Sequence, residues 1–464
     1  MAHHQTVYQT INPANGQLIK TFPTTTDEQV FAALDRAHEV YQKDWRRRSV
    51  GDRCKIMSKA AALMRERKQE LAELAVLEMG KTIGGMLGEV EFSAAILDYY
   101  ANNGEKFLQT IDLPGVPGAV IASEPIGVIL AIEPWNFPYY QVARVAGPQI
   151  VAGNPVMLKH AQSVPQCAIA LEKLFVDAGA PAGVYTNLFC SIPQVNALIA
   201  DFRIRGVTLT GSERAGASVA EQAGRHLKKA VLELGGSDPL VVLEDAPLDQ
   251  AVEVAAAGRM MCMGQACASI KRYIVVGKER GQKFLEGVKT KFEAMKAGDP
   301  MDPATTLGPL VSETAVENLV SLIDEAKAAG ATVVMGGKRI DRPGYYLEPT
   351  LITNVSRDNP LFMKEAFGPV ATLYVVDTEE EAIEVANATT FGLGSSVFSA
   401  NIEHAKKVAT EIEAGMVFIN SAVNSGPDVP FGGVKNSGFG RELSELGIQE
   451  FLNKKLVRVH QNWL

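Results

Sequence analysis

The chain has 464 residues, of which 47% are hydrophobic and 21% charged, and its net charge is −8. This length predicts roughly two to four globular domains, and the composition excludes a disordered or collagen-like chain. The acidic balance gives no global attraction to nucleic acid or to an anionic membrane, so an anionic substrate must be held by local positive charge.

The cysteines and the apolar runs restrict where the protein works. The five cysteines are an odd number and lie scattered along the chain, which does not describe a disulfide scaffold and predicts a reducing, cytoplasmic setting. The first residues are polar and contain no apolar signal core. The strongest apolar run, Pro125–Ile132, has eight residues. That is far fewer than the roughly 20 residues that span a bilayer, so it predicts a buried strand.

Strand and helix signals alternate along the first half of the chain. Helical spacing of apolar residues predicts helices over 53–80 and 86–109. After the turn-rich segment 113–118, short apolar runs predict strands at 127–131, 155–158, 183–185 and 206–210. Helices are predicted between and after them, at 139–153, 164–179, 193–200 and 214–226. Such alternation is typical of a parallel sheet with right-handed crossovers.

The alternation then restarts. Strands are predicted at 239–243, 273–276, 331–335 and 371–376, and helices at 247–263, 281–297, 379–388 and 401–413. We therefore predict an α/β fold of two domains that join near 234–236. A cleft between two such domains is a preferred place for a cofactor and a substrate.

Two cysteines near position 265 are candidates for a reactive thiol or for metal ligands. Cys267 ends the segment Gly-Gln-Ala-Cys at 264–267, where it is either a reactive thiol in an exposed turn or a buried structural thiol. Cys262 lies five positions earlier. With no second cysteine pair and no nearby histidine, the two make a poor zinc site, so we predict no metal.

Polar residues at the ends of predicted strands are further candidates. Glu233 lies in an apolar segment, where desolvation would suit a general base, although a Lys or Arg partner is the alternative. Asn136 lies between two prolines, so its amide is either an oxyanion donor or part of a strand-ending turn. The segment 210–216 joins a strand to a helix and aims backbone N–H groups at an anion. Lys159 could reach ribose hydroxyls or simply be solvated.

Together these motifs resemble the aldehyde dehydrogenase superfamily. The matching positions occur in the order of that superfamily: Asn136 in Pro-Trp-Asn-Phe-Pro, Lys159, Gly211-Ser212, Glu233 in Glu-Leu-Gly-Gly, Cys267 in Gly-Gln-x-Cys, Glu365 in Glu-Ala-Phe-Gly-Pro, Asn420, and the glycine-rich segment 430–442. Matches run from the segment 11–16 to the C-terminus.

The resemblance implies an overall architecture. It implies two doubly wound parallel-sheet domains with a small oligomerisation arm, and hence a homodimer or homotetramer. Residues 1–105 and 125–233 would form the dinucleotide-binding domain and residues 234–433 the catalytic domain. The segments 106–124 and 446–464 would supply the oligomerisation arm.

The resemblance also implies roles for individual residues. Cys267 would attack an aldehyde to give a hemithioacetal and then a thioester, with Asn136 and the Cys267 N–H holding the oxyanion. Glu233 would activate the water that releases the acid. The residues expected at the cofactor are Trp135, Lys159, Gln162, Ser163, Gly211, Ser212, Glu365 and Phe367.

Gln162 bears on the choice of cofactor. Superfamily members that prefer NAD often carry a glutamate at this position, three residues after the cofactor lysine. A carboxylate would repel a 2′-phosphate, whereas an amide would not. We therefore expect NADP to be favoured, with use of NAD left open.

Arg144 and Ser425 bear on the choice of aldehyde. They match the residues with which succinate-semialdehyde dehydrogenases, a branch of the superfamily, hold the substrate carboxylate, although Met261 replaces a second arginine of that branch. An interdomain ion pair is the alternative for Arg144. Oxidation of neutral aldehydes and a non-catalytic cofactor-binding protein remain open, whereas Glu233 disfavours transfer of the acyl group to coenzyme A.

Cys262 departs from the superfamily pattern, in which asparagine is common at that position. Cys262 either only packs in the core in place of the asparagine, or it forms a reversible disulfide with Cys267. The disulfide requires a suitable distance between the two residues.

Overall fold

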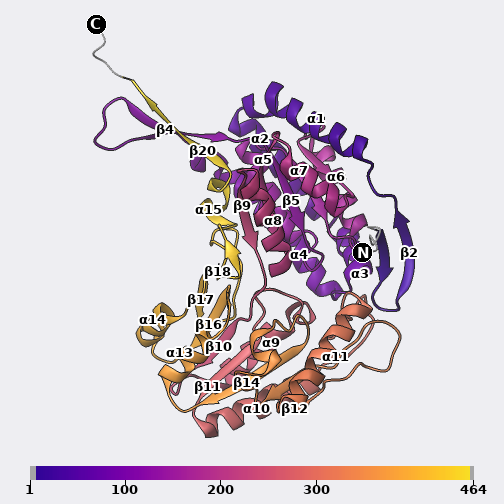
Figure 1. The fold of residues 1–464 in the computed structure, drawn as a ribbon, viewed down its shortest axis with the longest axis vertical. Helices are drawn as coiled ribbons and strands as arrows, with labels where there is room; N and C mark the ends of the chain where they lie inside the picture. The colour runs from indigo at the N-terminus through magenta and orange to yellow at the C-terminus, as the bar shows by residue number, and fades with distance from the viewer. Residues whose placement is uncertain (1–6, 460–464) are drawn as a thin grey trace.

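The computed structural model describes residues 7–459, which form two lobes and a protruding arm (Figure 1). The first lobe is built on a six-stranded sheet with strand order β19-β9-β8-β5-β6-β7. Its parallel strands are β5 (Val128–Glu133), β6 (Val156–His160), β7 (Tyr185–Asn187), β8 (Ile204–Thr210) and β9 (Lys229–Glu233). The strands β5 and β6 are buried almost throughout, which explains their continuous apolar sequence.

Helices connect these strands and cover the sheet. They are α5 (Tyr140–Ala152), α6 (Pro165–Ala178), α7 (Ile192–Ala200) and α8 (Glu213–Arg225). Ser212 caps α8, because its side chain accepts a hydrogen bond from the backbone N–H of Ala215. Gly153 ends α5 with a φ of 103°, a left-handed conformation that glycine adopts without steric cost.

The N-terminal part differs from the prediction. The single helix predicted over 53–80 is two helices, α2 (Val50–Glu66) and α3 (Lys68–Met79), because Arg67 between them leaves helical geometry with φ −95° and ψ 16°. The long helix α4 (Ile83–Phe107) follows. The hairpin of β1 (Tyr8–Asn12) and β2 (Gln17–Phe22) and the helix α1 (Asp27–Lys43) were not predicted.

The second lobe is built on a seven-stranded sheet with order β12-β13-β14-β11-β10-β16-β17. The strands are β10 (Pro239–Val242), β11 (Arg272–Val276), β12 (Thr332–Met335), β13 (Thr350–Thr353), β14 (Val370–Val376), β16 (Gly394–Phe398) and β17 (Met416–Ile419). All neighbours are parallel except β12 and β13. Helices of this lobe include α9 (Leu248–Met260), α10 (Lys278–Glu293), α11 (Glu313–Ala328), α12 (Pro360–Met363), α13 (Glu379–Asn387) and α14 (Ile402–Glu411). Two parallel α/β sheets match the predicted fold class.

The chain then returns to the first lobe. The strand β18 (Val434–Lys435) pairs with β15 (Phe391–Gly392), and β19 (Gly438–Phe439) pairs with β9, so that Gly438 lies beside Glu233. The short helix α15 (Ser444–Gln449) leads into β20. The last part of the chain therefore supplies one wall of the region around Glu233.

The protruding arm is a three-stranded antiparallel sheet of β3 (Ile111–Asp112), β4 (Ala119–Pro125) and β20 (Leu452–Arg458) (Figure 1). These strands come from the segments predicted for oligomerisation, of which residues 460–464 lie outside the described part of the chain. Between residues 7 and 459, no helix combines the length and the apolar character needed to cross a membrane.

Candidate active site

The carboxyl ends of three parallel strands place acidic and hydroxyl side chains in one row. Ile132 of β5 pairs with Leu209 of β8, and Thr210 of β8 pairs with Glu233 of β9. Glu133, Thr210 and Glu233 therefore lie on neighbouring strands at the same edge of the sheet. Ligands of open α/β sheets bind outside this edge.

The loop that carries Cys267 begins with strained backbone. After α9 ends at Met260, Cys262 and Met263 have φ values of 53° and 55°, and Gly264 follows at 75°. Consecutive left-handed residues other than glycine are costly and are found where surrounding contacts impose them. Beyond this turn, Cys267 is half-buried and lines a cavity of about 520 Å³.

Burial and neighbouring charges act in opposite directions on the pKa of the Cys267 thiol. Burial raises its pKa to about 12, and the positive charges of Arg144 and Lys271 act against this rise. Reaction as a thiolate therefore depends on nearby cations.

Asn136 is buried in the turn after β5. Its Nδ2 donates to the carbonyl oxygen of Gln265, 2.8 Å away, and its Oδ1 accepts from Nε2 of Gln141 at 3.0 Å. These two bonds fix the orientation of the amide. An amide nitrogen carries two hydrogens, so one remains for another acceptor.

Glu233 is almost fully buried, and neither of its carboxyl oxygens has a hydrogen-bond partner among the described residues. Burial and the neighbouring charge of Glu442 raise the pKa of Glu233 well above its ordinary value, while Arg144 and Arg441 act in the opposite direction. An unpartnered carboxyl group with a raised pKa is suited to proton transfer near neutral pH.

A second cavity, of about 470 Å³, lies at the N-terminus of α8. Ser212, Glu213, Glu365 and Phe391 are among the residues that line it. Glu365 is fixed by the backbone N–H of Gly236 at 3.1 Å. The N-terminus of a 13-residue helix favours a phosphate, and a carboxylate can bind ribose hydroxyls, so this cleft fits a dinucleotide.

Trp135, Lys159 and Gly211 also lie at this edge of the first sheet, whereas Phe367 comes from the second lobe, between α12 and β14. The rings of Trp135 and Phe367 meet edge to face with centroids 5.9 Å apart, and the N–H of Gly211 donates to the Glu233 carbonyl at 2.9 Å. Lys159 is at the end of β6 with Nζ 5.8 Å from the ring of Tyr8, and burial lowers the pKa of Lys159.

Gln162 and Ser163 follow β6 in the next turn, where Gln162 is exposed and Ser163 is half-buried. Neither residue, nor Lys159, lines the two cavities described above. Their roles at the cofactor therefore remain predictions.

Arg144 requires a correction. We expected its guanidinium to meet a substrate carboxylate, but it is buried and does not line the cavity. Its Nε lies 2.7 Å from Oε2 of Glu442, and its Nη2 donates to Oγ1 of Thr210 at 3.2 Å. The structure therefore shows an ion pair, but not the interdomain one that the sequence left as the alternative, since Glu442 lies on the segment that returns to the first lobe.

Arg144 nevertheless reaches the cavity through Tyr140. Its Nη1 donates to the Tyr140 hydroxyl at 3.4 Å, and that hydroxyl donates to Oγ of Ser425 at 3.1 Å. Tyr140 and Ser425 both line the cavity that contains Cys267. Glu442 holds the pKa of Arg144 above its ordinary value although burial lowers it, so this arginine stays cationic.

Cys262 lines the same cavity as Cys267. It is buried, with Sγ 3.5 Å from the carbonyl oxygen of Asn136, and burial raises its pKa to about 11. The disulfide between the two cysteines stays a prediction.

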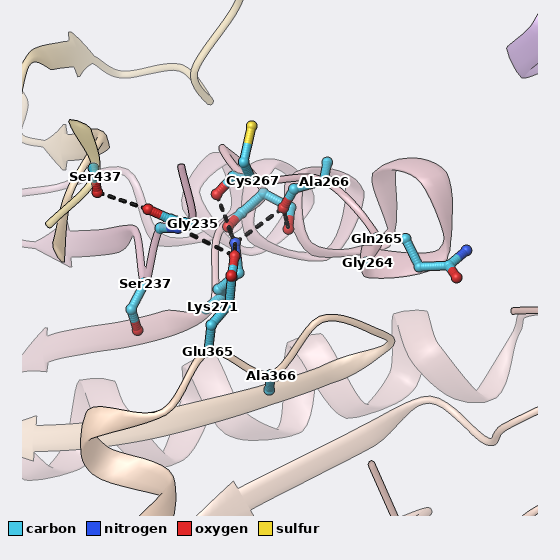
Figure 2. A network of polar contacts seen from close by, with 12 residues as sticks. Gly235, Ser237, Gly264, Gln265, Ala266, Cys267, Lys271, Glu365, Ala366 and Ser437 are labelled. Carbon is cyan, nitrogen blue, oxygen red and sulfur yellow. Dashed lines mark hydrogen bonds and ion pairs between the residues drawn. The ribbon is translucent and has the colours of Figure 1, made fainter. Parts of the chain in front are cut away.

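Two buried cations that support the catalytic loop were missed by the sequence reasoning. Arg259 of α9 donates to the carbonyls of Gly264 at 2.8 Å, Ala366 at 3.1 Å and Ile270 at 3.2 Å. Lys271 donates to the carbonyls of Ala266 and Cys267 in the same loop (Figure 2). The signal that could have found them is a cation in an apolar segment that flanks Cys267. No cluster of three potential metal ligands is found within residues 7–459.

Comparisons with known proteins place these features in a family. A family model described as "Aldehyde dehydrogenase family" matches residues 1–457. A succinate-semialdehyde dehydrogenase [NADP(+)] of Deinococcus radiodurans is 50% identical, over 97% of this chain and 94% of that protein. A probable succinate-semialdehyde dehydrogenase [NADP(+)] of Synechocystis is 45% identical, over 97% of this chain and 98% of that protein.

Solved structures agree with the sequence comparisons. The crystal structure of succinic semialdehyde dehydrogenase from Streptococcus pyogenes, in complex with NADP+ as the cofactor, superposes with a TM-score of 0.96. The two sequences are 47% identical, and the match covers 97% of this chain and 99% of the other.

Proposed function

The chain belongs to the aldehyde dehydrogenase family, and we propose that it oxidises succinate semialdehyde to succinate with NADP as the preferred cofactor. The observation that carries the choice of substrate is the chain of contacts from Arg144 through Tyr140 to Ser425, which ends in the cavity of Cys267. The names of the similar proteins support the same choice.

Carbon–sulfur bond formation is the first step. The thiolate of Cys267 attacks the aldehyde carbon, and the free hydrogen of the Asn136 amide and the N–H of Cys267 bind the oxyanion of the hemithioacetal. A preorganised donor of this kind contributes roughly 3–4 kcal/mol. Ser212 and Glu365 would hold NADP in their cleft, and the bound cofactor would supply the hydride acceptor needed for the hemithioacetal to become a thioester.

Glu233 then acts on water. In its ionised form the carboxylate takes a proton from a water molecule, whose oxygen attacks the thioester carbon and releases succinate and the Cys267 thiol. The raised pKa makes this carboxylate a stronger base than an exposed one, while Arg144 and Arg441 keep the ionised form accessible.

The cavity supplies a place for the distal carboxylate of the substrate. The Ser425 oxygen accepts the hydrogen of Tyr140, so the hydrogen of Ser425 is free to donate to an anion. The guanidinium of Arg144 lies behind Tyr140, with its centre 4.7 Å from that ring, and supplies positive charge. Charge-assisted hydrogen bonds are about twice as strong as neutral ones, which favours an anionic substrate here.

Neutral aldehydes are the second candidate substrates. Apolar side chains such as Phe92, Phe137, Met260 and Phe431 form much of the cavity, and they would accept an aliphatic or aromatic chain. A steady-state panel that crosses succinate semialdehyde and butanal with NADP and NAD tests the proposal. We expect the highest kcat/KM for succinate semialdehyde with NADP, and an equal or higher value for butanal would contradict it.

We also propose that the arm joins copies of the chain into a homodimer or homotetramer. The strand β20 is an outer strand of its sheet and exposes Leu456 and Val457 by 59% and 44%. An unprotected apolar edge strand favours pairing with another chain. Light scattering of the wild type and of Leu456→Lys is the test, and a monomeric wild type would contradict the proposal.

A further inference from the structure

Lys271 lies between the catalytic loop and the cofactor cleft. It directly precedes β11 and is only 3% exposed. Its Nζ donates to the carbonyl oxygens of Cys267 at 2.6 Å and Ala266 at 2.9 Å, with that of Ser269 farther away at 3.3 Å. The same ammonium pairs with Oε1 of Glu365 at 3.1 Å (Figure 2). An ammonium has three hydrogens, so these four acceptors share them and leave none for another partner.

Glu365 connects this ammonium to the cofactor cleft. Its Oε1 also accepts from the N–H of Gly236, and the residue lines the second cavity together with Ser212. Lys271 therefore contacts, through one atom, the backbone of the predicted nucleophile and the carboxylate predicted to bind a ribose.

The contact with Ala266 has a geometric consequence. The carbonyl of Ala266 and the N–H of Cys267 belong to one planar peptide group, so a bond that holds the carbonyl also fixes the direction of the N–H. That N–H is one of the two proposed oxyanion donors. The thiol of Cys267 points away from Lys271, so Lys271 acts on it through charge and backbone position rather than contact (Figure 2).

We propose that Lys271 is a positioning residue that couples occupation of the cofactor cleft at Glu365 to the orientation and reactivity of Cys267. A cofactor that engages Glu365 changes how that carboxylate shares Lys271, and the ammonium passes the change to the peptide groups of Ala266 and Cys267. The inference rests on the proposed role of Cys267 as the nucleophile, but not on the identity of the aldehyde.

The electrostatic surroundings of Cys267 set the expected direction. The charged and titratable groups near its thiol are Arg144 and Tyr140 of α5, Lys271 before β11, Asp238 before β10 and Glu365 after α12. Lys271 favours the thiolate, whereas Glu365 and Asp238 disfavour it. Loss of Lys271 and loss of the Glu365 charge must therefore shift the reactivity of the thiol in opposite directions.

Alkylation by iodoacetamide tests this without any aldehyde. The rate at Cys267 is followed by mass spectrometry against pH, with and without NADP, in the wild type, Lys271→Met, Lys271→Arg and Lys283→Met. Lys283 is a control because its pair with Glu279 is on the surface. We expect Lys271→Met to raise the apparent pKa of Cys267, so that alkylation is about tenfold slower at a given pH. We also expect this variant to lose the effect of NADP on the rate.

Lys271→Arg should restore part of both effects, and Lys283→Met should behave as the wild type. The proposal is overturned if NADP has no effect on the wild type, or if Lys271→Met keeps the wild-type pH profile and the wild-type effect of NADP. If Lys271→Met does not fold, Glu365→Gln decides, since it should lower the apparent pKa of Cys267. An unchanged or raised value would overturn the inference. Because no aldehyde is used, these results do not depend on which aldehyde the enzyme oxidises.

Discussion

Replacement of Ser425 by alanine isolates recognition of the substrate carboxylate. Ser425 lines the cavity and accepts from Tyr140 at 3.1 Å, so its own hydrogen is the one that can reach an anion. Removing a hydrogen bond to a charged group costs about 1.5–3 kcal/mol. This corresponds to a loss of roughly 10- to 150-fold in kcat/KM for succinate semialdehyde. The loss for butanal should be small, since butanal has no charge to bind.

The assay is initial-rate production of NADPH with both aldehydes at saturating NADP. Ser356→Ala, at an exposed position in the second lobe, is the matched control and should change neither value. If Ser425→Ala lowers kcat/KM equally for both aldehydes, the side chain does not bind the carboxylate and the choice of substrate fails.

Three further predictions concern the acid–base, electrostatic and redox chemistry of the site. Activity of the wild type should rise as the pH rises through the raised pKa of Glu233, because only the ionised carboxylate accepts a proton. Glu233→Gln should lose this pH dependence and lower steady-state turnover about 100-fold, but it should keep the burst of NADPH in the first turnover. Rapid-mixing kinetics measure the burst, and its absence in this variant would contradict the role of Glu233 in hydrolysis.

Arg144→Met leaves Glu442 buried without its partner, and urea unfolding should show a loss of about 3–5 kcal/mol, with part recovered in Arg144→Met/Glu442→Gln. A loss within about 0.5 kcal/mol would show that the pair is not needed for stability. Treatment with mild peroxide should produce a disulfide-linked peptide of Cys262 and Cys267, which mass spectrometry detects. If this peptide is absent, Cys262 has no redox role and only packs in the core.

The fold was largely predictable where burial is continuous. The run at 127–131 predicted β5, because a strand buried on both faces needs apolar residues at successive positions. The strand β16, Gly-Ser-Ser-Val-Phe, has no such signal, although all five residues are buried and the strand lies inside the sheet between β10 and β17. Likewise, Arg67 breaks the predicted helix 53–80 without any glycine or proline to mark the position.

The candidate site was predictable in its residue types but not in all its contacts. The motifs predict one site for Cys267, Asn136 and Glu233. The structure shows Asn136 bonded to Gln265, two residues before Cys267, while the joint role of the three stays a prediction. The partner of Arg144 could not be inferred, because Glu442 lies near the other end of the chain and reaches α5 only through the return of the chain to the first lobe. The left-handed backbone conformation at Cys262 could not be predicted from the sequence either, because tertiary contacts impose it.

The pairing of β19 with β9 has a consequence for how the protein is made. Until residues 438–439 leave the ribosome, the edge of the nascent first sheet beside Glu233 has no neighbour, although the rest of that sheet was synthesised much earlier. An uncovered edge invites pairing with other chains, so the period between these two events is when the newborn polypeptide is most exposed to aggregation. Maturation of the enzyme is therefore delayed until residues 438–439 have been translated.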